Sequence, residues 1–386
     1  MIIDLSRALA GPYCTALLSD LGARVIKIES GSGDPARNWP PFDGDHSLYF
    51  DSTNRNKQSI WLDLYTDAGR AVLDDLLSGA DVLVENFKTG TLASMGYPLD
   101  RLRELNDKLI LASVSAYGST GPMAGHAGLD QVIQARAGLT SVTGPADGEA
   151  YRVGLPVIDL SAGMTAAVGI LALLYGRDKG RPQRQVSTSL YETAVAMSVF
   201  QGQRALTTGE APTRQGNDHP SITPYGAFAT ETDVIVIAVS TEKHFRAFAE
   251  LLGHPGWVED QRFSTSRART EHRAALREAI EKTLSTRPAE EWIRDIGALG
   301  IPCGPIQDYL QVMDDEQTDA LKMIAHSQRG DGSNLSLLRG PLNLDGQPTH
   351  VRSAPPMLSE QADEVLSRLG LTKDEIADLR SRAIVR

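Results

Sequence analysis

The sequence predicts an α/β protein that combines a large domain, built on an open parallel sheet, with a smaller α+β domain. Over residues 1–201, short apolar runs alternate with helix-like segments, the pattern of a parallel sheet buried on both faces. The length of 386 residues exceeds that of one ordinary domain. Residues 202–224 are dominated by Thr, Gly, Pro, Asn, Asp and His without apolar periodicity, so we expect a linker there.

The first region follows the order of a doubly wound sheet. Short apolar runs predict strands at Ile2–Leu5, Arg24–Glu29, Ser59–Leu62, Asp81–Glu85 and Leu109–Val114. Helices are expected between them, one starting after Ala10 and ending at Gly22, the others at Asp67–Ser78 and Leu99–Leu105. The dinucleotide fingerprint G-x-G-x-x-G does not follow the first strand, which argues against an ordinary NAD enzyme.

The second region reads as a smaller α+β domain followed by a return of the chain. A hairpin is predicted from Tyr225–Phe228 and Val234–Val239. Amphipathic periodicity predicts helices at Phe245–Leu252, Arg273–Leu284, Ala289–Leu299, Ser359–Leu369 and Thr372–Arg382. Residues 331–356 are loop- and strand-like, and Thr372 with Glu375 resembles a capping box.

Composition excludes several classes of function. Hydrophobic residues make up 41% and charged residues 23% of the chain, as in globular proteins. The net charge of −11 argues against general nucleic-acid binding. We expect no membrane span and no secretory signal, and with only Cys14 and Cys303 we expect neither disulfide framework nor structural zinc, which fits a cytoplasmic location. The eight histidines show no metal-ligand spacing, so a metal hydrolase is disfavoured.

Residues 153–174 contain one acid, Asp159, among apolar and small residues. Gly154–Ile158 reads as an extended run, and Ser161–Gly163 opens a long helix that reaches Leu174. A carboxylate between a strand and a helix start is stabilised by backbone N–H groups and the helix dipole. Two interpretations stay open on this pattern. Asp159 is either only the N-cap of the helix, or a nucleophilic or acid–base carboxylate held at the helix mouth.

Several stretches, taken in order, resemble the family III coenzyme A transferases. This is the CaiB/BaiF family, which includes formyl-CoA and carnitine-CoA transferases and is related to 2-methylacyl-CoA racemases. Each motif is weak alone, but the set, its order and its spacing over the whole chain are specific. The matching stretches are Ala10–Pro12, Leu21–Ala23, Val25–Glu29, Asn54–Lys57, Asp81–Phe87, Ser113–Pro122, Leu129–Gln131, Ala137–Leu139, Thr143–Gly144 and the block around Asp159.

The resemblance implies an architecture that composition does not. The large domain of such proteins is Rossmann-like and uses both chain termini, and two ring-like chains interlock as a homodimer. For this chain it implies a CoA-binding large domain at residues 1–201, completed by residues 342–386. Linkers are then expected at 202–224 and 308–341, around a small domain at 225–307.

The resemblance also implies a reaction in which the residue matching Asp159 is the nucleophile. Its carboxylate attacks an acyl-CoA thioester, and an aspartyl-CoA thioester then passes CoA to a small carboxylic acid, with succinyl-CoA a common donor. Such a carboxylate needs partial desolvation without protonation, and donors for the oxyanion. We expect Leu155–Ile158 to supply the apolar flank and the amides of Ser161–Gly163 to supply the donors.

Coenzyme A is expected as a substrate, with no tightly bound cofactor and no metal. Asn86 and Phe87 end a strand, where open sheets place ligands, and Lys88 follows as a phosphate partner. Ala8 and Leu9 are expected to face the thiol end of pantetheine. Two further candidates are weighed against plain structural roles. Arg37 pairs with the adenosine phosphates or is a surface charge, and Tyr117 lines the acyl end or packs in the core.

Departures from the family pattern keep alternatives open. Formyl-CoA transferases carry a glutamine where this chain has Leu9, which argues against formate as the substrate. Racemases carry a histidine directly before the residue that matches Asp130, because two bases must flank the α-carbon. Here that position is Leu129, and His126 lies three residues earlier. The racemase is therefore the runner-up, and a CoA-binding protein without turnover is a third interpretation.

Overall fold

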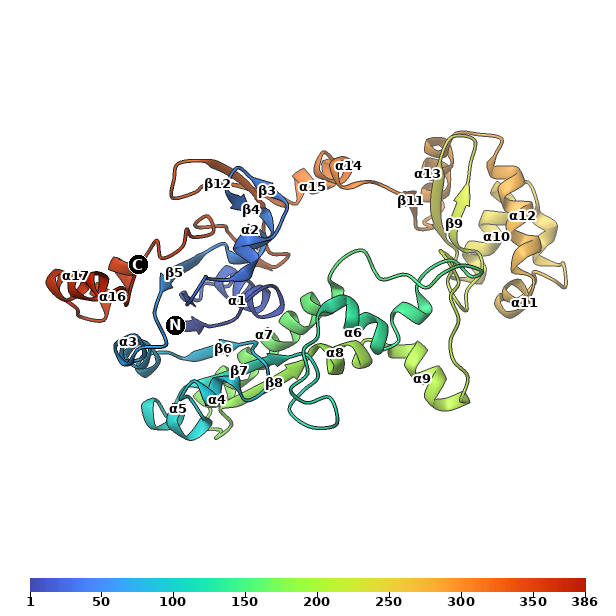
Figure 1. The fold of residues 1–386 in the computed structure, drawn as a ribbon. Coiled ribbons are helices and arrows are strands. Elements are labelled where there is room, and N and C mark those ends of the chain that lie inside the picture. The colour runs from blue at the N-terminus through green and yellow to red at the C-terminus, as the bar shows by residue number, and fades with distance from the viewer. The chain divides into compact units, whose positions relative to one another are not determined.

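The computed structural model describes all 386 residues, which divide into two compact units. The large unit comprises residues 1–139, 153–207 and 316–386, and the small unit comprises residues 140–152 and 208–315. Both termini belong to the large unit, so the chain leaves it and returns (Figure 1).

A six-stranded parallel sheet forms the centre of the large unit (Figure 1). Its strand order is β5-β2-β1-β6-β7-β8, which by position in the sheet is 3-2-1-4-5-6, the order of the doubly wound dinucleotide-binding fold. The winding direction reverses between β1 and β6, which pair directly with Ile3 opposite Leu83. The strands span β1 Ile2–Asp4, β2 Val25–Glu29, β5 Lys57–Trp61, β6 Val82–Glu85, β7 Ile110–Ser115 and β8 Gln185–Ser189.

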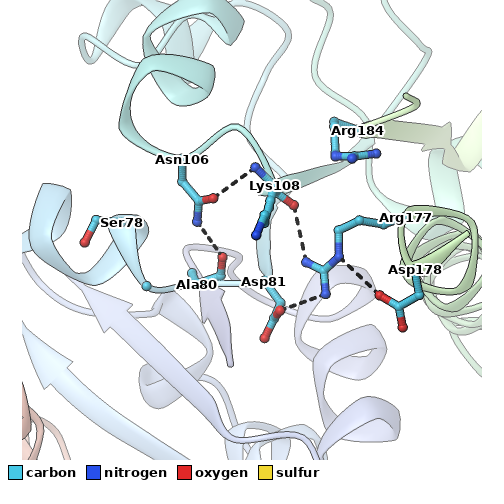
Figure 2. A pocket seen from close by; sticks show the side chains of 9 residues that line it. Ser78, Ala80, Asp81, Asn106, Lys108, Arg177, Asp178 and Arg184 are labelled. Atoms are coloured by element: carbon cyan, nitrogen blue, oxygen red, sulfur yellow. Dashed lines mark hydrogen bonds and ion pairs between the residues drawn. The ribbon is translucent and has the colours of Figure 1, made fainter. Parts of the chain in front are cut away.

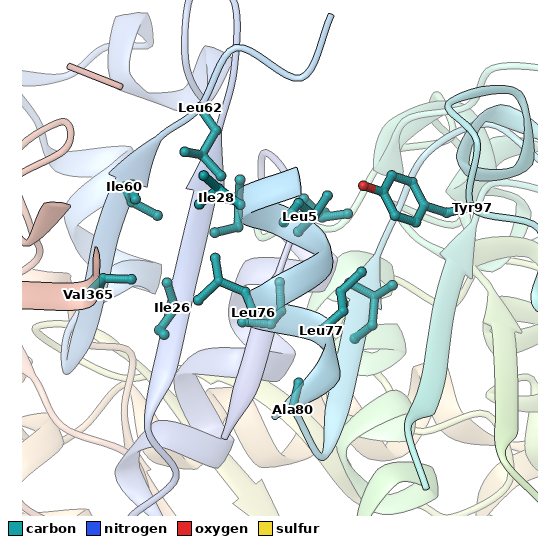
Figure 3. Close-up of a cluster of buried hydrophobic side chains, with 14 of the residues drawn as sticks. Leu5, Ile26, Ile28, Ile60, Leu62, Leu76, Leu77, Ala80, Tyr97 and Val365 are labelled. Atoms are coloured by element: carbon teal, nitrogen blue, oxygen red, sulfur yellow. The ribbon is translucent and has the colours of Figure 1, made fainter. Parts of the chain in front are cut away.

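Helices cover both faces of this sheet, because its strands alternate side chains between two apolar cores. On one face, α3 (Asp67–Ser78) contributes Leu76 and Leu77 to the core that also contains Ile26 (Figure 3). On the other face lie α1 (Ala10–Asp20) and α7 (Val157–Asp178), which pack against each other. The remaining helices of the large unit are α2 Leu48–Asn54, α4 Thr91–Ser94, α5 Leu99–Leu105, α6 Asp130–Arg136, α8 Leu190–Ala196 and α9 Val199–Thr208.

The C-terminal segment completes the first of these cores. Helices α16 (Ala362–Arg368) and α17 (Lys373–Ser381) add Val365 and Ile376 to it. The capping box predicted at Thr372 is confirmed. Short elements precede these helices, namely α15 Glu316–Ala320, the hairpin β12 Ile324–Gln328 with β13 Asn334–Leu338, and the pair β14 Asn343–Leu344 with β15 Gln347–Pro348.

The small unit has a three-stranded antiparallel sheet of order β11-β10-β9. The predicted hairpin is confirmed as β9 (Tyr225–Ala229) paired with β10 (Val234–Ala238), and β11 is Cys303–Pro305. Its core includes Phe245 and Ile280. The helices of this unit are α10 Glu242–Leu251, α11 Ser266–Glu271, α12 Arg273–Leu284, α13 Ala289–Ala298 and α14 Tyr309–Met313.

The structure corrects three predicted boundaries. Residues 154–156 form no strand, and α7 already begins at Val157. Helix α9 occupies residues 199–208, so regular structure extends into the predicted linker at 202–224, because helix formers continue through Ala205 and Leu206 before the turn residues begin. The predicted return linker at 308–341 contains α14, α15 and the β12–β13 hairpin.

Helix α7 is the one helix long and apolar enough to cross a membrane, judged by length and composition. It is also a core helix of the large unit, with Ile158, Ala162 and Ile170 buried, and it packs against α1, β7 and β8. Asp159 lies in its first turn and Arg177 in its last. Core helices of α/β domains pass the same composition test, so this finding assigns no membrane contact, and the cytoplasmic location stays a prediction.

Candidate active site at the switch point of the sheet

The reversal of winding between β1 and β6 brings two loops together at the carboxyl edge of the sheet. Residues 6–9 follow β1, and residues 86–88 follow β6. Since the two strands are neighbours and parallel, both loops leave the sheet on the same side. Open α/β sheets bind ligands in the crevice at this point.

The side chain of Asn86 fixes the loop after β1 through hydrogen bonds to the backbone N–H and the backbone carbonyl of Arg7. Its Oδ1 accepts from the Arg7 N–H at 2.8 Å, and its Nδ2 donates to the Arg7 carbonyl at 2.7 Å. One residue later, Asp34 Oδ1 accepts from the Ala8 N–H at 3.0 Å. Ala8 has φ of +66°, a conformation costly for a residue with Cβ, so these bonds stabilise a strained turn.

A buried charge network lies beneath this loop. Lys27 and Lys57, which belong to stretches of the family resemblance, are buried, as are Asp4 and Asp34. Lys27 Nζ lies 2.8 Å from Asp34 and donates to the Ser6 carbonyl at 2.8 Å, and Lys57 Nζ lies 3.1 Å from Asp4. The lysines hold the pKa of Asp4 down to about 2 against the opposing effect of burial. Buried charges are retained at such cost where they fix a geometry, here that of the loop.

Asp159 is the third residue of α7 and is half-buried. Burial, and then the negative charge of Asp130, raise the pKa of Asp159 to about 7. A carboxylate with this pKa is more basic and more nucleophilic than an exposed one, and it is still partly ionised near neutral pH. The interpretation of Asp159 as N-cap is wrong, because the N-cap position is Pro156.

The helix is instead capped from outside by Asp130, the first residue of α6. Asp130 Oδ2 accepts from the amides of Ile158 at 2.8 Å and of Asp159 at 3.2 Å. Gln134, buried one turn later, donates to Asp130 Oδ1, and its own Oε1 accepts from the Val153 amide at 2.8 Å. The Asp130 carboxylate therefore satisfies two first-turn amide donors of α7 and fixes the backbone of Asp159.

The donors expected at Ser161–Gly163 are in the wrong place. These residues occupy the fifth to seventh positions of α7, where each amide donates to the carbonyl four residues earlier. A different set lies beside them. A Cβ on Gly163 would stand 2.6 Å from the Ala10 carbonyl, so the first turn of α1 packs directly against α7 one turn after Asp159. The first-turn amides of α1 have no carbonyl partner within their own helix.

Tyr49, on α2, is a further candidate for the site that the sequence pattern did not reveal. Burial raises its pKa to about 12, and the next contributions come from the charges of Asp159, Asp130 and Asp34. Its ring meets Trp39 edge-on, with ring centres 5.1 Å apart. The raised pKa favours the protonated phenol, and the charge of Asp159 contributes to that rise. In the sequence, Tyr49 stands between Leu48 and Phe50, and no signal there separates it from a packing residue.

The residues that we expect to bind the nucleotide lie at this edge of the sheet, but several of them already have hydrogen-bond partners within the protein. Arg37 forms two hydrogen bonds to Glu29, at 2.8 and 2.7 Å, and donates to the Pro356 carbonyl. Its guanidinium also stacks 3.7 Å from the centre of the Phe50 ring. These contacts give Arg37 a structural role behind the loop. Lys88, by contrast, is exposed directly after Asn86.

The other residues that we expect to contact coenzyme A are partly or fully packed within the large unit. Phe87 packs on the core and carries the guanidinium of Arg7 over its ring at 5.3 Å. Leu9 is buried as the N-cap residue of α1, whereas Ala8 is only half-buried. Tyr117 lies 6.0 Å from Tyr191, ring centre to ring centre, and packs against the second core.

The residues relevant to a racemase lie on the segment before α6. Leu129 is 69% exposed, and His126 is exposed as well. The position directly before Asp130 therefore carries an aliphatic side chain turned to solvent, which accepts no proton. No group of three or more His, Cys, Asp and Glu side chains is arranged to hold a metal ion.

Comparison with known proteins shows the family of the chain. The model of the family described as CoA-transferase family III matches residues 1–362. An acetyl-CoA:oxalate CoA-transferase from Acetobacter aceti is 35% identical over 364 residues, which is 94% of this chain and 92% of that protein. A succinate–glutarate CoA-transferase from Agrobacterium fabrum is 33% identical over 376 residues, with 95% and 94% covered.

Solved structures show the same fold. The crystal structure of a CAIB/BAIF family protein from Brucella suis superposes with a TM-score of 0.82 at 32% identity, covering 95% of this chain and 97% of that one. A structure from Mycobacterium tuberculosis gives a TM-score of 0.83 at 30% identity, with 94% and 96% covered. The chain therefore belongs to CoA-transferase family III, and it is an enzyme that transfers coenzyme A between acids.

Proposed function

We propose that Asp159 is the covalent nucleophile of this CoA transfer. The observation that carries the proposal is the half-buried carboxylate in the first turn of α7, whose pKa is raised to about 7 beside the switch point. Desolvation makes the carboxylate reactive. The fixed dipoles of the helix start take the place of the water that would otherwise solvate it. The anion is formed at neutral pH in a useful fraction of molecules.

The reaction proceeds by four acyl transfers. The Asp159 carboxylate attacks the thioester carbonyl, which forms a mixed anhydride and releases CoA thiolate. The thiolate attacks the aspartyl carbonyl, which frees the donor acid and leaves an aspartyl-CoA thioester. The acceptor carboxylate attacks this thioester and releases the thiolate again. The thiolate finally attacks the acceptor's carbonyl, which gives the new acyl-CoA and restores Asp159.

Each step develops negative charge on a carbonyl oxygen, and this charge needs donors that are already oriented. We assign this role to the first-turn amides of α1, at Ala10 and Gly11, because that turn packs beside α7 at Gly163. The dipole of α1 favours an anion at the same place. The Tyr49 hydroxyl, which stays protonated, is a second donor toward Asp159.

For coenzyme A we retain the edge formed by the two loops. Lys88 is the exposed cation for a phosphate, and Phe87 with Ala8 and Leu9 borders the path of the pantetheine arm. Asn86 acts by holding Arg7, and Arg37 by holding Glu29 behind the loop. Tyr117 stays a candidate for the acyl end.

We further propose succinyl-CoA as the donor and a dicarboxylic acid as the acceptor. Named relatives support this choice, since their acceptors are oxalate, glutarate and mesaconate, and each carries a second carboxylate. The test is mass detection of new thioesters when the protein and succinyl-CoA are incubated with a panel of mono- and dicarboxylic acids. Turnover restricted to monocarboxylic acids contradicts this substrate class and leaves the nucleophile assignment intact.

The covalent route has its own test. Hydroxylamine added during turnover should convert an activated Asp159 into a hydroxamate, which peptide mass spectrometry detects at that residue. Asp159→Asn serves as the matched control, because it keeps the shape and removes the nucleophile. An unmodified Asp159 peptide from an enzyme that is actively turning over contradicts the aspartyl-CoA intermediate.

We also propose that the enzyme is an interlocked homodimer. Helix α7 leaves Met164, Val168, Leu171 and Tyr175 exposed on one face, and Val168 is 67% exposed. A row of apolar side chains at this spacing on a soluble protein is normally covered by a partner. The test is to mix dimers that carry two different tags. Interlocked chains exchange only after unfolding, whereas rapid exchange under native conditions contradicts the threaded arrangement.

A further inference from the structure

A second cavity lies at the opposite edge of the large sheet from Asp159. It has a volume of about 280 Å³ and adjoins the start of β2, where Arg24 precedes the strand. Its other charged walls are Arg352, from the segment after β15, and Glu364 with Arg368 on α16. Because the strands are parallel, their amino ends lie on the far side of the sheet from the switch point. The cavity is therefore separate from the site described above.

The lining of this cavity has more positively charged side chains than carboxylates to pair with them. It is lined by three guanidinium groups and only one carboxylate. Arg24 Nε donates to Gln58 Oε1 at 2.8 Å, but its Nη2 is buried and has no hydrogen-bond partner. A buried donor without an acceptor costs free energy, and natural proteins leave few such groups without an ion, a ligand or water.

The charges around Arg24 reinforce this imbalance. Burial lowers its pKa, and the nearby positive charge of Arg368 lowers it further. Glu364 is the only group that acts in the opposite direction, and it is already paired with Arg368 at 3.0 Å. That pair is solvent-exposed, so its own strength is small. An anion between the two guanidinium groups would remove their repulsion.

A third guanidinium is held in place at the same cavity. Arg352 donates through Nη2 to the Ser19 carbonyl at 2.7 Å, which ties its side chain to the end of α1. Two of the three arginines are thus anchored, one by Gln58 and one by Ser19, before any ligand arrives. Guanidinium groups match the oxygens of carboxylates and phosphates through paired N–H donors.

We propose that this cavity is a binding site for a small dianionic oxyanion, a phosphate or a dicarboxylate, held by Arg24, Arg352 and Arg368. The ligand's oxygens accept from Arg24 Nη2, and its charge offsets that of Arg368. Glu364 competes with the ligand for Arg368, so the site binds more weakly than its three arginines alone would.

A neighbouring cavity provides a matched control. It lies at the same edge and is lined by Lys108, Arg177 and Arg184, as Figure 2 shows. There Asp81 already accepts from Arg177 at 2.9 Å, and Arg177 also lies 3.8 Å from Asp178. Its lining has two carboxylates, Asp81 and Asp178, for three cations, against one for three around Arg24. Arg184 Nε is also buried without a hydrogen-bond partner there, and the volume is larger, about 480 Å³.

The test is calorimetric titration of the full chain with inorganic phosphate and, separately, with succinate, at constant ionic strength maintained with chloride. We expect binding of at least one anion with Kd below about 10 mM. Arg368→Gln should weaken that binding by about tenfold, the effect of one charge-assisted hydrogen bond. Glu364→Gln should strengthen it. Both side chains are solvent-exposed, so both variants should keep the fold, which the melting temperature verifies.

Two controls separate this site from others. Lys108→Gln removes a cation from the neighbouring cavity and should leave the binding unchanged, whereas Lys88→Gln removes only the fraction of phosphate that binds at the proposed CoA edge. Binding of phosphate alone or of succinate alone identifies which oxyanion the site takes. No binding of either anion to the wild type overturns the proposal, as does binding that is lost in Lys108→Gln or Lys88→Gln but unaffected by Arg368→Gln and Glu364→Gln. The readout involves no catalysis, so it is independent of the role of Asp159.

Discussion

Asp130 Oδ2 lies 3.2 Å from the backbone nitrogen of Asp159 and accepts its hydrogen bond. The same carboxylate therefore fixes the position of Asp159 through the backbone and raises its pKa through space. The Asp130 carboxylate, which caps α7 from a neighbouring helix, therefore has two effects of opposite sign on stability. It stabilises the first turn of α7 and destabilises the charged form of the side chain in that turn.

Replacing the nucleophile tests the centre of the proposal. Asp159→Ala should abolish CoA exchange, because no other residue takes over the covalent step, while the protein stays folded. The measurement is the transfer of label from free CoA into acyl-CoA, with circular dichroism as the control for folding. Exchange at the wild-type rate in a folded variant contradicts the role of Asp159.

Asp130 should control the pH at which the enzyme becomes active. Only ionised Asp159 attacks, so the rate should fall as pH drops below about 7. Asp130→Asn keeps an oxygen that accepts from α7 but removes the like charge, and the pKa of Asp159 should fall. The acid limb of kcat/KM against pH should then move to lower pH. If Asp159 sets this limb without help from Asp130, the profile keeps its wild-type midpoint.

The raised pKa of Asp159 also predicts a stability cost at high pH. The folded protein holds this proton up to about pH 7, whereas the unfolded chain releases it near the ordinary value of 3.8. The free energy of unfolding should therefore fall as pH rises between these values, with the full penalty present above pH 7.

Asp159→Asn removes that penalty. Each pKa unit corresponds to about 1.4 kcal/mol, so the variant should gain a few kcal/mol at pH 8 and little at pH 4. Thermal unfolding of both proteins at the two pH values measures the difference. A gain of equal size at both pH values shows that it comes from packing and not from the carboxylate's charge.

Asn86 should matter through the loop it holds. Asn86→Ala leaves the N–H and the carbonyl of Arg7 without their partner, so the turn at Ala8 loses its support. We expect CoA binding to weaken by about 1–3 kcal/mol, the usual effect of losing such bonds. Lys88→Ala is the comparison, since it removes a charge and leaves the loop intact.

The salt dependence of KM separates these two effects. Weakening through Lys88 should diminish at high ionic strength, because exposed charges are screened. Weakening through Asn86 should persist. If both variants respond identically to salt, Asn86 does not act through the backbone of Arg7.

Tyr49→Phe tests the second donor that we propose for Asp159. The change removes one hydroxyl and keeps the ring that meets Trp39, so the fold should be unaffected. We expect kcat to fall by about tenfold or more, as for loss of one hydrogen bond to a charged group, with KM for CoA nearly unchanged. An increase confined to KM would place Tyr49 in substrate binding only.

The local sequence determined most of the secondary structure and singled out Asp159 as the candidate nucleophile. The alternation of apolar runs predicted five strands of the large sheet, since each of these is a short buried stretch, and turn residues marked where helices such as Asp67–Ser78 end. The sixth strand, β8, was not predicted, because its sequence QVSTS is polar and partly exposed. The apolar stretch around Asp159 also indicated partial desolvation of this acid, whereas its raised pKa emerged only from the structure.

Only the tertiary structure decided which groups act on that acid. Asp130 is separated from Asp159 by 29 residues, and it caps α7 because α6 packs there. Asn86 reaches Arg7 across 79 residues because β1 and β6 are neighbours, and Arg37 turns inward to Glu29. Periodicity records which face of an element is buried, whereas partners far apart in the chain depend on how strands and helices are ordered in space.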